Sequence, residues 1–185
     1  MKTQFNSLTP DLISQRKTVH ELCRQFSRSP SKGNLKRLKA LFSQCGEHVI
    51  IESGFHMDYG DNVILGDRVY ININCTMLDG MADNISEHQH CAPTITLGDD
   101  CLIGPNVQFL AVSHDIEPAL RQTHKHNYAQ AITLGKNVWL GGGVIILAGV
   151  TIGDNSVIGA GSVVTKDVAT NSFYAGNPSQ KVRDL

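Results

Sequence analysis

An aliphatic residue returns at every sixth position through the C-terminal part of the chain, and it is followed four residues later by a second small or aliphatic residue. A period of six fits neither the 3.6 of a helix nor the 2 of a flat strand, but it equals three strand periods. An extended chain that turns a corner every six residues would point the same side chain inward at each corner, and Gly-Asp, Gly-Lys and Gly-Gly pairs stand where tight bends need them. The period therefore predicts a parallel β-helix built from hexapeptide repeats. The first set is Leu134, Leu140, Ile146, Ile152, Ile158 and Val164, and the second is Val138, Val144, Val150, Ser156, Ser162 and Val168.

The same register continues upstream, with two interruptions. The interruptions, residues 80–93 and 114–131, are polar and rich in histidine. Loops carried by a rigid scaffold are where binding and catalytic residues concentrate, so we expect chemistry there. The upstream inward positions are Tyr59, Leu65, Ile71, Met77, Leu97, Ile103 and Phe109, with Cys101, Val107 and Ser113 at the second position.

The N-terminal segment has a different pattern. Thr9, Pro10 and Asp11 are typical of a helix start, and apolar residues then recur at helical spacing as far as Phe26. Residues 29–33 should end this helix, and a second short helix should carry Leu35, Leu38, Leu41 and Phe42. We therefore expect a helical cap over residues 1–45 and a β-helix over 46–185. Covering the open end of the coil and contacting substrate are both compatible roles for the cap.

Composition restricts the classes of function. The 185 residues carry a net charge of −1, which gives no bulk attraction to nucleic acid or to an acidic membrane. No apolar run is long enough to span a bilayer, and the N-terminus lacks the apolar core of a signal peptide, so a cytoplasmic location is expected. The cysteines are five in number and form no CxxC pair, which argues against a disulfide framework.

Several segments resemble the maltose and galactoside O-acetyltransferases of the hexapeptide superfamily. They are FHMDYGDN (55–62), VYININCTMLD (69–79), GPNVQFLAVSHDIEPALR (104–121), KNVWLGGGVIILAGVTIGDNSVIGAGSVVTKDV (136–168) and AGNP (175–178), together with the N-terminal helices. The resemblance implies a left-handed coil, a homotrimer with active sites between subunits, acetyl-CoA as the donor and a sugar hydroxyl as the acceptor. It implies no metal requirement.

The resemblance also suggests roles for individual residues on the acceptor side. His114 occupies the position of the family's general base, and a histidine suits that task because it titrates near neutral pH. Asn72 takes the place of an asparagine that contacts the acceptor, with Tyr70 and Asp58 beside it. Asn72 and Asn74, two apart, should point to the same side of a strand, although bonding to the backbone at turns is an open alternative. Asp79 could contact the acceptor or form a turn.

On the donor side the resemblance points to contacts with CoA. Residues 141–143, three glycines, would let the pantetheine arm approach closely because they lack a Cβ atom. For two of the matching residues a structural role is also open: Lys166 could be a solvated lysine at a turn, and Trp139 could pack between coils. The residues that match donor contacts are Trp139, Gly142, Ala160, Thr165 and Lys166, and the basic residues Lys181 and Arg183 could meet the phosphates.

The chain departs from the family pattern at several places. Gly80 stands where the galactoside enzymes have a sugar-binding aspartate, and in the N-terminal segment Asn6 or Ser7 replaces an acidic residue that contacts the acceptor in the family. Asp115 replaces a usual proline, and Gln180 replaces an arginine. The identity of the acceptor is therefore open.

Two other classes of function remain as alternatives. A zinc-dependent carbonic anhydrase-like enzyme would draw on the histidines and the cysteine of the two interruptions, and a non-catalytic scaffold would act through its flat faces. The possible zinc ligands are His88, His90, Cys91, His114, His124 and His126. We expect direct acetyl transfer rather than an acetylated Cys91 or Cys101.

Overall fold

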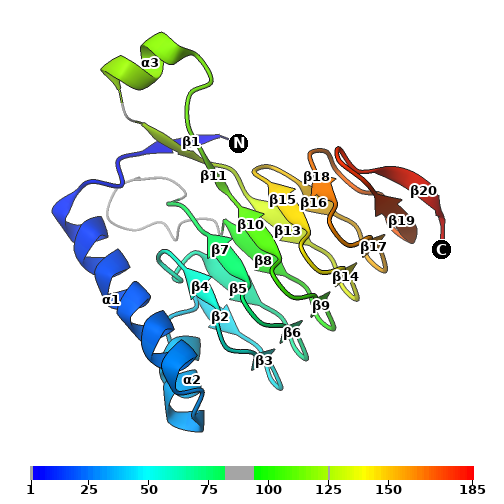
Figure 1. Ribbon diagram of the computed structural model, residues 1–185, viewed down its shortest axis with the longest axis horizontal. Coiled ribbons are helices and arrows are strands. Elements are labelled where there is room, and N and C mark those ends of the chain that lie inside the picture. The colour runs from blue at the N-terminus through cyan, green and yellow to red at the C-terminus, as the bar shows by residue number, and fades with distance from the viewer. Residues whose placement is uncertain (1, 82–93, 125) are drawn as a thin grey trace.

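The chain winds into a coil of short strands with two helices at one end (Figure 1). The computed structural model describes residues 2–81, 94–124 and 126–185. Each turn of the coil adds one strand to each of three largely parallel sheets, and the strands inside each sheet pair with strands of the turns before and after them. The prediction of a mostly β chain with a short N-terminal helical segment is confirmed. No helix in the described ranges has the length and apolar character needed to cross a membrane.

The three sheets follow the order of the turns. The first contains β2 (Gln44–Cys45), β5 (Val63–Leu65), β8 (Ile95–Leu97), β13 (Ile132–Leu134) and β16 (Thr151–Ile152). The second contains β3 (Ile50–Ile51), β6 (Tyr70–Ile71), β9 (Leu102–Ile103), β14 (Trp139–Leu140), β17 (Val157–Ile158), β19 (Ser172–Ala175) and the antiparallel β20 (Gln180–Asp184). The third contains β4 (His56–Met57), β7 (Thr76–Leu78), β10 (Gln108–Leu110), β15 (Ile145–Leu147) and β18 (Val163–Val164).

The inward hexad positions form the core, with two corrections. All of the predicted positions from Leu65 onward are buried except Ser113, which is half-buried. Tyr59 is buried but lies in a separate cluster with Phe5 and Ala129. The inward residue of β4 is Met57, which pairs with Met77. The register therefore slips by two residues before Leu65, and the coil has an earlier turn, beginning at Gln44, that the prediction missed.

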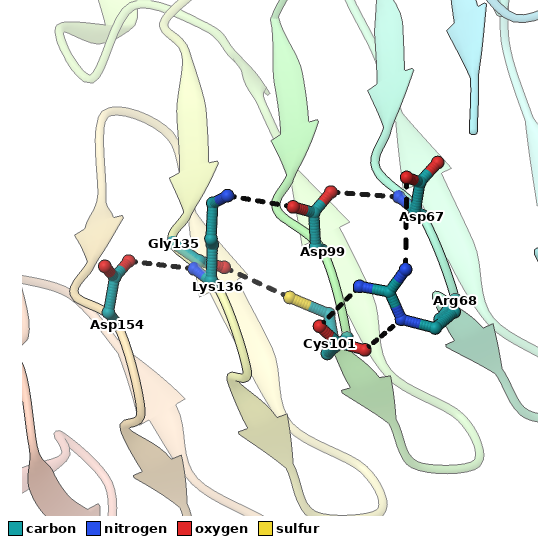
Figure 2. Close-up of polar contacts among 8 residues, drawn as sticks. Asp67, Arg68, Asp99, Cys101, Gly135, Lys136 and Asp154 are labelled. Carbon is teal, nitrogen blue, oxygen red and sulfur yellow. Dashed lines mark hydrogen bonds and ion pairs between the residues drawn. The ribbon is translucent and has the colours of Figure 1, made fainter. Parts of the chain in front are cut away.

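The Gly-Asp corners are joined by a ladder of carboxylates (Figure 2). The carboxylate of Asp67 accepts the amide hydrogen of Glu47 at 2.8 Å, and that of Asp99 accepts the amide of Asp67 at 3.0 Å. Asp154 accepts the amide of Lys136 at 2.8 Å in the same way. Each aspartate thus satisfies a backbone donor of the preceding turn, which keeps successive corners in register.

The N-terminal helices close the end of the coil formed by β2, β3 and β4 (Figure 1). The helix α1 (Pro10–Arg28) begins as predicted, with Thr9 as N-cap, and α2 (Lys32–Lys39) follows. Buried side chains of both helices belong to the same apolar cluster as the coil: Val19, Cys23, Phe26 and Leu38. Covering the open end of the coil is therefore one role of this segment.

The interruption at 114–131 is more structured than predicted. It contains α3 (Pro118–Thr123) and β12 (Asn127–Ala129), and β12 pairs antiparallel with β11 (Val112–Ser113) and with β1 (Thr3–Phe5). Figure 1 shows α3 projecting away from the coil. The loop prediction was wrong for β12, because its partner β1 comes from more than 120 residues earlier and leaves no local signal. Of the other predicted loop, residues 82–93 lie outside the described part.

Candidate active site

His114 directly follows β11, at the base of the α3 segment. Its Nδ1 lies 3.1 Å from the carbonyl oxygen of His126. Because a carbonyl can only accept, this contact places the hydrogen of a neutral ring on Nδ1 and leaves the lone pair on Nε2. The exposed ring is thus oriented as a proton acceptor.

The segment after His114 is held by two further hydrogen bonds. Tyr128 donates its hydroxyl hydrogen to Asp115 Oδ2 at 3.1 Å. Arg121 donates to the carbonyl oxygen of Asp115 at 2.8 Å. Asp115, which replaces a proline of the family pattern, therefore fixes the backbone beside His114 by its side chain.

A cavity of about 330 Å³ opens beside His114. Sequence reasoning pointed to Asp58 and named Ser7, with Asn6, as a possible replacement for an acidic contact of the family. It missed Arg16 and Asn127, because only tertiary packing brings them to this cavity. The lining residues are Phe5, Ser7, Arg16, Asp58, Tyr59, Leu78, Val112, His114 and Asn127.

Hydrogen bonds hold the polar side chains of this cavity in place. Arg16 donates to the Tyr59 hydroxyl at 2.9 Å, and Asn127 donates to the Ser7 hydroxyl at 2.7 Å. Asp58 Oδ1 lies 3.0 Å from His20 Nε2. The cavity thus presents a cation, a carboxylate and neutral donors and acceptors, which together suit a ligand with several hydroxyl groups.

Asp79 is fully buried and takes part in a turn. Its carboxylate accepts the amide hydrogens of Asp58 and Tyr59 at 3.0 Å each, and that of Gly60 at 2.7 Å. Burial raises the pKa of Asp79 to about 6, with the nearby charge of Asp58 acting in the same direction. These contacts favour the turn-forming alternative for Asp79, at the place where the register slips by two residues.

A second cavity, of about 640 Å³, lies on the coil at the C-terminal turns. It brings together four of the predicted donor-side residues, Trp139, Gly142, Ala160 and Arg183. Thr165 and Lys166 are exposed after β18, and Lys181 pairs with Asp184 at 2.6 Å; none of the three lines this cavity. The lining residues are Asn72, Gly104, Pro105, Trp139, Gly141, Gly142, Val157, Ile158, Gly159, Ala160, Phe173, Arg183 and Leu185.

Asn72 lines this second cavity and not the cavity that contains His114. The strand β6 ends at Ile71, so Asn72 and Asn74 lie at a corner, and the expectation that they share one side of a strand is wrong. Asn72 Oδ1 accepts the amide hydrogen of Ile73 at 2.8 Å. Asn74 has a φ of 59°, a left-handed conformation that asparagine tolerates. The turn-forming alternative thus accounts for Asn74, and for part of the bonding of Asn72.

An apolar stripe runs along the outside of the second sheet. Three of its members are exposed although they are large and apolar: Ile50 by 51%, Leu102 by 49% and Trp139 by 54%. Exposed apolar stripes of this kind mark surfaces that pack against another molecule. Tyr70, predicted as an acceptor contact, belongs to this stripe and lines neither cavity. The stripe stacks in register as Ile50, Tyr70, Leu102, Trp139, Val157 and Phe173.

One group of potential metal ligands occurs among the described residues: His20, His56 and Asp58. Burial, and then the charge of His20, lowers the pKa of His56. Sequence reasoning missed this group, because His20 and His56 are far apart along the chain. The alternative zinc site does not form from His114, His124 and His126 in the described part, and His88, His90 and Cys91 lie outside it.

The coil, the oriented histidine and the two cavities define a hexapeptide-repeat transferase. Residues 131–166 match the family described as Bacterial transferase hexapeptide (six repeats). A galactoside O-acetyltransferase of Escherichia coli (strain K12) is 36% identical over 184 residues, which cover 98% of this chain and 84% of the relative. The chain therefore belongs to the maltose and galactoside O-acetyltransferase family of hexapeptide-repeat acyltransferases, as the sequence motifs predicted.

Solved structures agree with this assignment. A maltose O-acetyltransferase from Clostridium difficile 630 superposes with a TM-score of 0.86 at 33% identity, covering 99% of this chain and 92% of that chain. A hexapeptide-repeat acetyltransferase from Vibrio cholerae O1 biovar eltor, solved with acetyl coenzyme A, gives a TM-score of 0.84 at 32% identity, with coverages of 98% and 92%.

Proposed function

We propose that the protein is an acetyl-CoA-dependent O-acetyltransferase that acetylates a sugar hydroxyl, with His114 as the general base. The observation that carries the proposal is the Nδ1 contact of His114 with the His126 carbonyl, which directs a basic Nε2 outward beside a polar cavity. Ser7, Arg16 and Asp58 would bind the acceptor hydroxyl groups there. Asp79 and Tyr70 would act indirectly. Asp79 would hold the turn that carries Asp58, and Tyr70 would pack within the apolar stripe.

The second cavity would hold acetyl-CoA. Its apolar walls suit the pantetheine arm, and Gly142 allows close approach because it has no Cβ atom. Trp139 and Ala160 would contact the arm, and Arg183 would pair with a phosphate. Thr165, Lys166 and Lys181 remain proposed contacts of the nucleotide part, which would extend beyond the cavity along the exposed corner.

The assembly we propose is the homotrimer implied by the family resemblance, wound from left-handed coils. Within one chain Asn72 and Trp139 line the donor cavity, whereas His114 lines the other cavity. A neighbouring subunit packed on the apolar stripe would bring a donor cavity to a His114, so that Asn72 could contact the acceptor across the interface. The location remains proposed as cytoplasmic.

The reaction would proceed by direct transfer. The acceptor oxygen attacks the thioester carbon while its proton moves to His114 Nε2. The carbon–sulfur bond then breaks, and the imidazolium returns the proton to the CoA thiolate, which leaves an acetyl ester and free CoA. Burial raises the pKa values of the Cys75 and Cys101 thiols to about 11, so neither is a ready nucleophile.

The His114→Ala variant tests the role of the base. We expect turnover to fall by about 10² to 10⁴ while acetyl-CoA affinity stays within a factor of about two, because the ring acts on a proton. His124→Ala, which changes a nearby exposed histidine, is the matched control and should keep turnover near the parent value. Unchanged turnover in His114→Ala would contradict the mechanism.

Two further measurements address the substrate and the intermediate. A panel of maltose, glucose and galactosides, assayed by thiol release, should identify an acceptor. If the protein did not bind acetyl-CoA at all, a non-catalytic scaffold would be favoured instead. Mass spectrometry after incubation with acetyl-CoA alone should show unmodified protein. An acetyl group on a cysteine, lost together with activity in the Cys→Ala variant, would contradict direct transfer.

A further inference from the structure

Three side chains from two elements converge where α1 packs on the first turn of the coil. His20 comes from α1, His56 from β4, and Asp58 directly follows β4. One nitrogen or oxygen from each residue lies within 4.8 Å of those from the other two. His20 Nε2 and Asp58 Oδ1 are 3.0 Å apart, and the two imidazole rings have centroids 4.4 Å apart with planes inclined by 51°.

These distances fit a small transition-metal ion. Zinc bonds of about 2.0–2.2 Å in tetrahedral geometry place neighbouring ligand atoms about 3.4 Å apart. The His20–Asp58 separation is already close to this value, and side-chain rotation about χ angles can close a separation of 4.8 Å. Two imidazole nitrogens and one carboxylate oxygen are a common donor set for zinc, and they leave a fourth position for water.

The three ligands are carried by backbone that is fixed independently of any ion. Val19, next to His20, is buried in the core, and Met57, between His56 and Asp58, pairs with Met77. The amide of Asp58 donates to Asp79. Because packing has already positioned both elements, little backbone ordering would oppose binding.

The surroundings are compatible with a cation. Arg24, a helix cation whose charge acts on His56, is paired with Glu21 at 2.9 Å, and Arg16 donates to the Tyr59 hydroxyl. The side chains of His20 and Asp58 keep 27% and 23% of their surface exposed, so an ion can enter from solvent. Both arginines thus have other partners, and the cluster stays accessible.

We propose that His20, His56 and Asp58 bind one zinc-class divalent ion that fastens α1 to the coil. Asp58 also lines the cavity of His114, so an ion that draws on its carboxylate would change how that cavity receives an acceptor. This consequence for the acceptor rests on the proposed function, whereas the binding of the ion is independent of it.

The test uses the full chain, stripped with a chelator and then titrated with zinc against a chromophoric competitor, without acetyl-CoA or acceptor. We expect one ion per chain, and an affinity at least about 100-fold weaker in each of His20→Gln and His56→Gln, because each variant loses a direct ligand. Zinc should raise the thermal midpoint of the parent and not that of the two variants.

A matched control is His48→Asn, which changes an exposed histidine outside the cluster at a left-handed position that asparagine accepts. It should bind zinc like the parent. Cobalt titration of the parent supplies a second measurement that needs no variant: a visible absorption band of moderate intensity indicates a nitrogen- and oxygen-ligated site. No stoichiometric zinc in the parent, or parent-like affinity in both glutamine variants, would overturn the proposal.

Discussion

Replacing Asp79 by alanine tests whether this carboxylate holds a turn or contacts the acceptor. The substitution leaves the buried amides of Tyr59 and Gly60 without their acceptors. An unsatisfied buried amide costs about 1–3 kcal/mol, so two of them should lower the free energy of unfolding by roughly 2–6 kcal/mol. Asp58 should also shift, because its amide shares the same carboxylate.

The pH dependence of this loss follows from the raised pKa of Asp79. The folded value of about 6 exceeds the ordinary 3.8, so the folded state holds the proton more tightly than the unfolded state. Stability of the parent therefore falls as pH rises from about 4 to about 6, by up to about 3 kcal/mol at 1.36 kcal/mol per unit. The alanine variant lacks this group, so the difference between the two proteins should shrink across that range.

Urea unfolding at pH 4.5, 5.5 and 7, followed by circular dichroism, measures both quantities. A stability difference that grows with pH would show that the three amides outweigh burial and would refute the reasoning about the charge. An alanine variant as stable as the parent at every pH, with only its acceptor KM raised, would instead assign Asp79 to acceptor binding.

Four further substitutions have calculable effects. Gly135→Ala should cost about 1–3 kcal/mol in urea unfolding, because a Cβ atom would collide with Asp154, whereas Gly33→Ala in α2 has room and should stabilise by up to about 1 kcal/mol. Gly142→Val should raise the KM for acetyl-CoA by roughly tenfold or more, because the valine side chain would fill part of the second cavity, and an unchanged KM would place the donor elsewhere. Arg183→Ala should raise the same KM about 10- to 100-fold at low salt, and the effect should diminish with added salt; a salt-independent effect would argue against phosphate pairing.

The coil could be predicted because its signal is local. Leu134 and Ile152 pair across one turn, and the side chains at every hexad position between them point inward. The spacing alone therefore predicts which side chains are buried. The same approach failed at Tyr59, since Tyr59 and Met57 are both apolar and both buried, and only the pairing of Met57 with Met77 shows which belongs to the coil. His114 could be named from its motif, but the hydrogen bond that orients it comes from His126.

By itself, then, the sequence determined the period of the coil, the helical cap and the family, because each depends on residues within a few positions of one another. Tertiary structure alone decided the contacts between turns and between the cap and the coil. It placed Asn72 and His114 in different cavities of the chain, let Asp79 accept the amide hydrogen of Asp58, and brought the rings of His20 and His56 into contact. The reason is that the stacking of successive turns, and insertions of variable length between them, determine which distant residues come into contact. The spacing of residues along the chain does not predict these contacts.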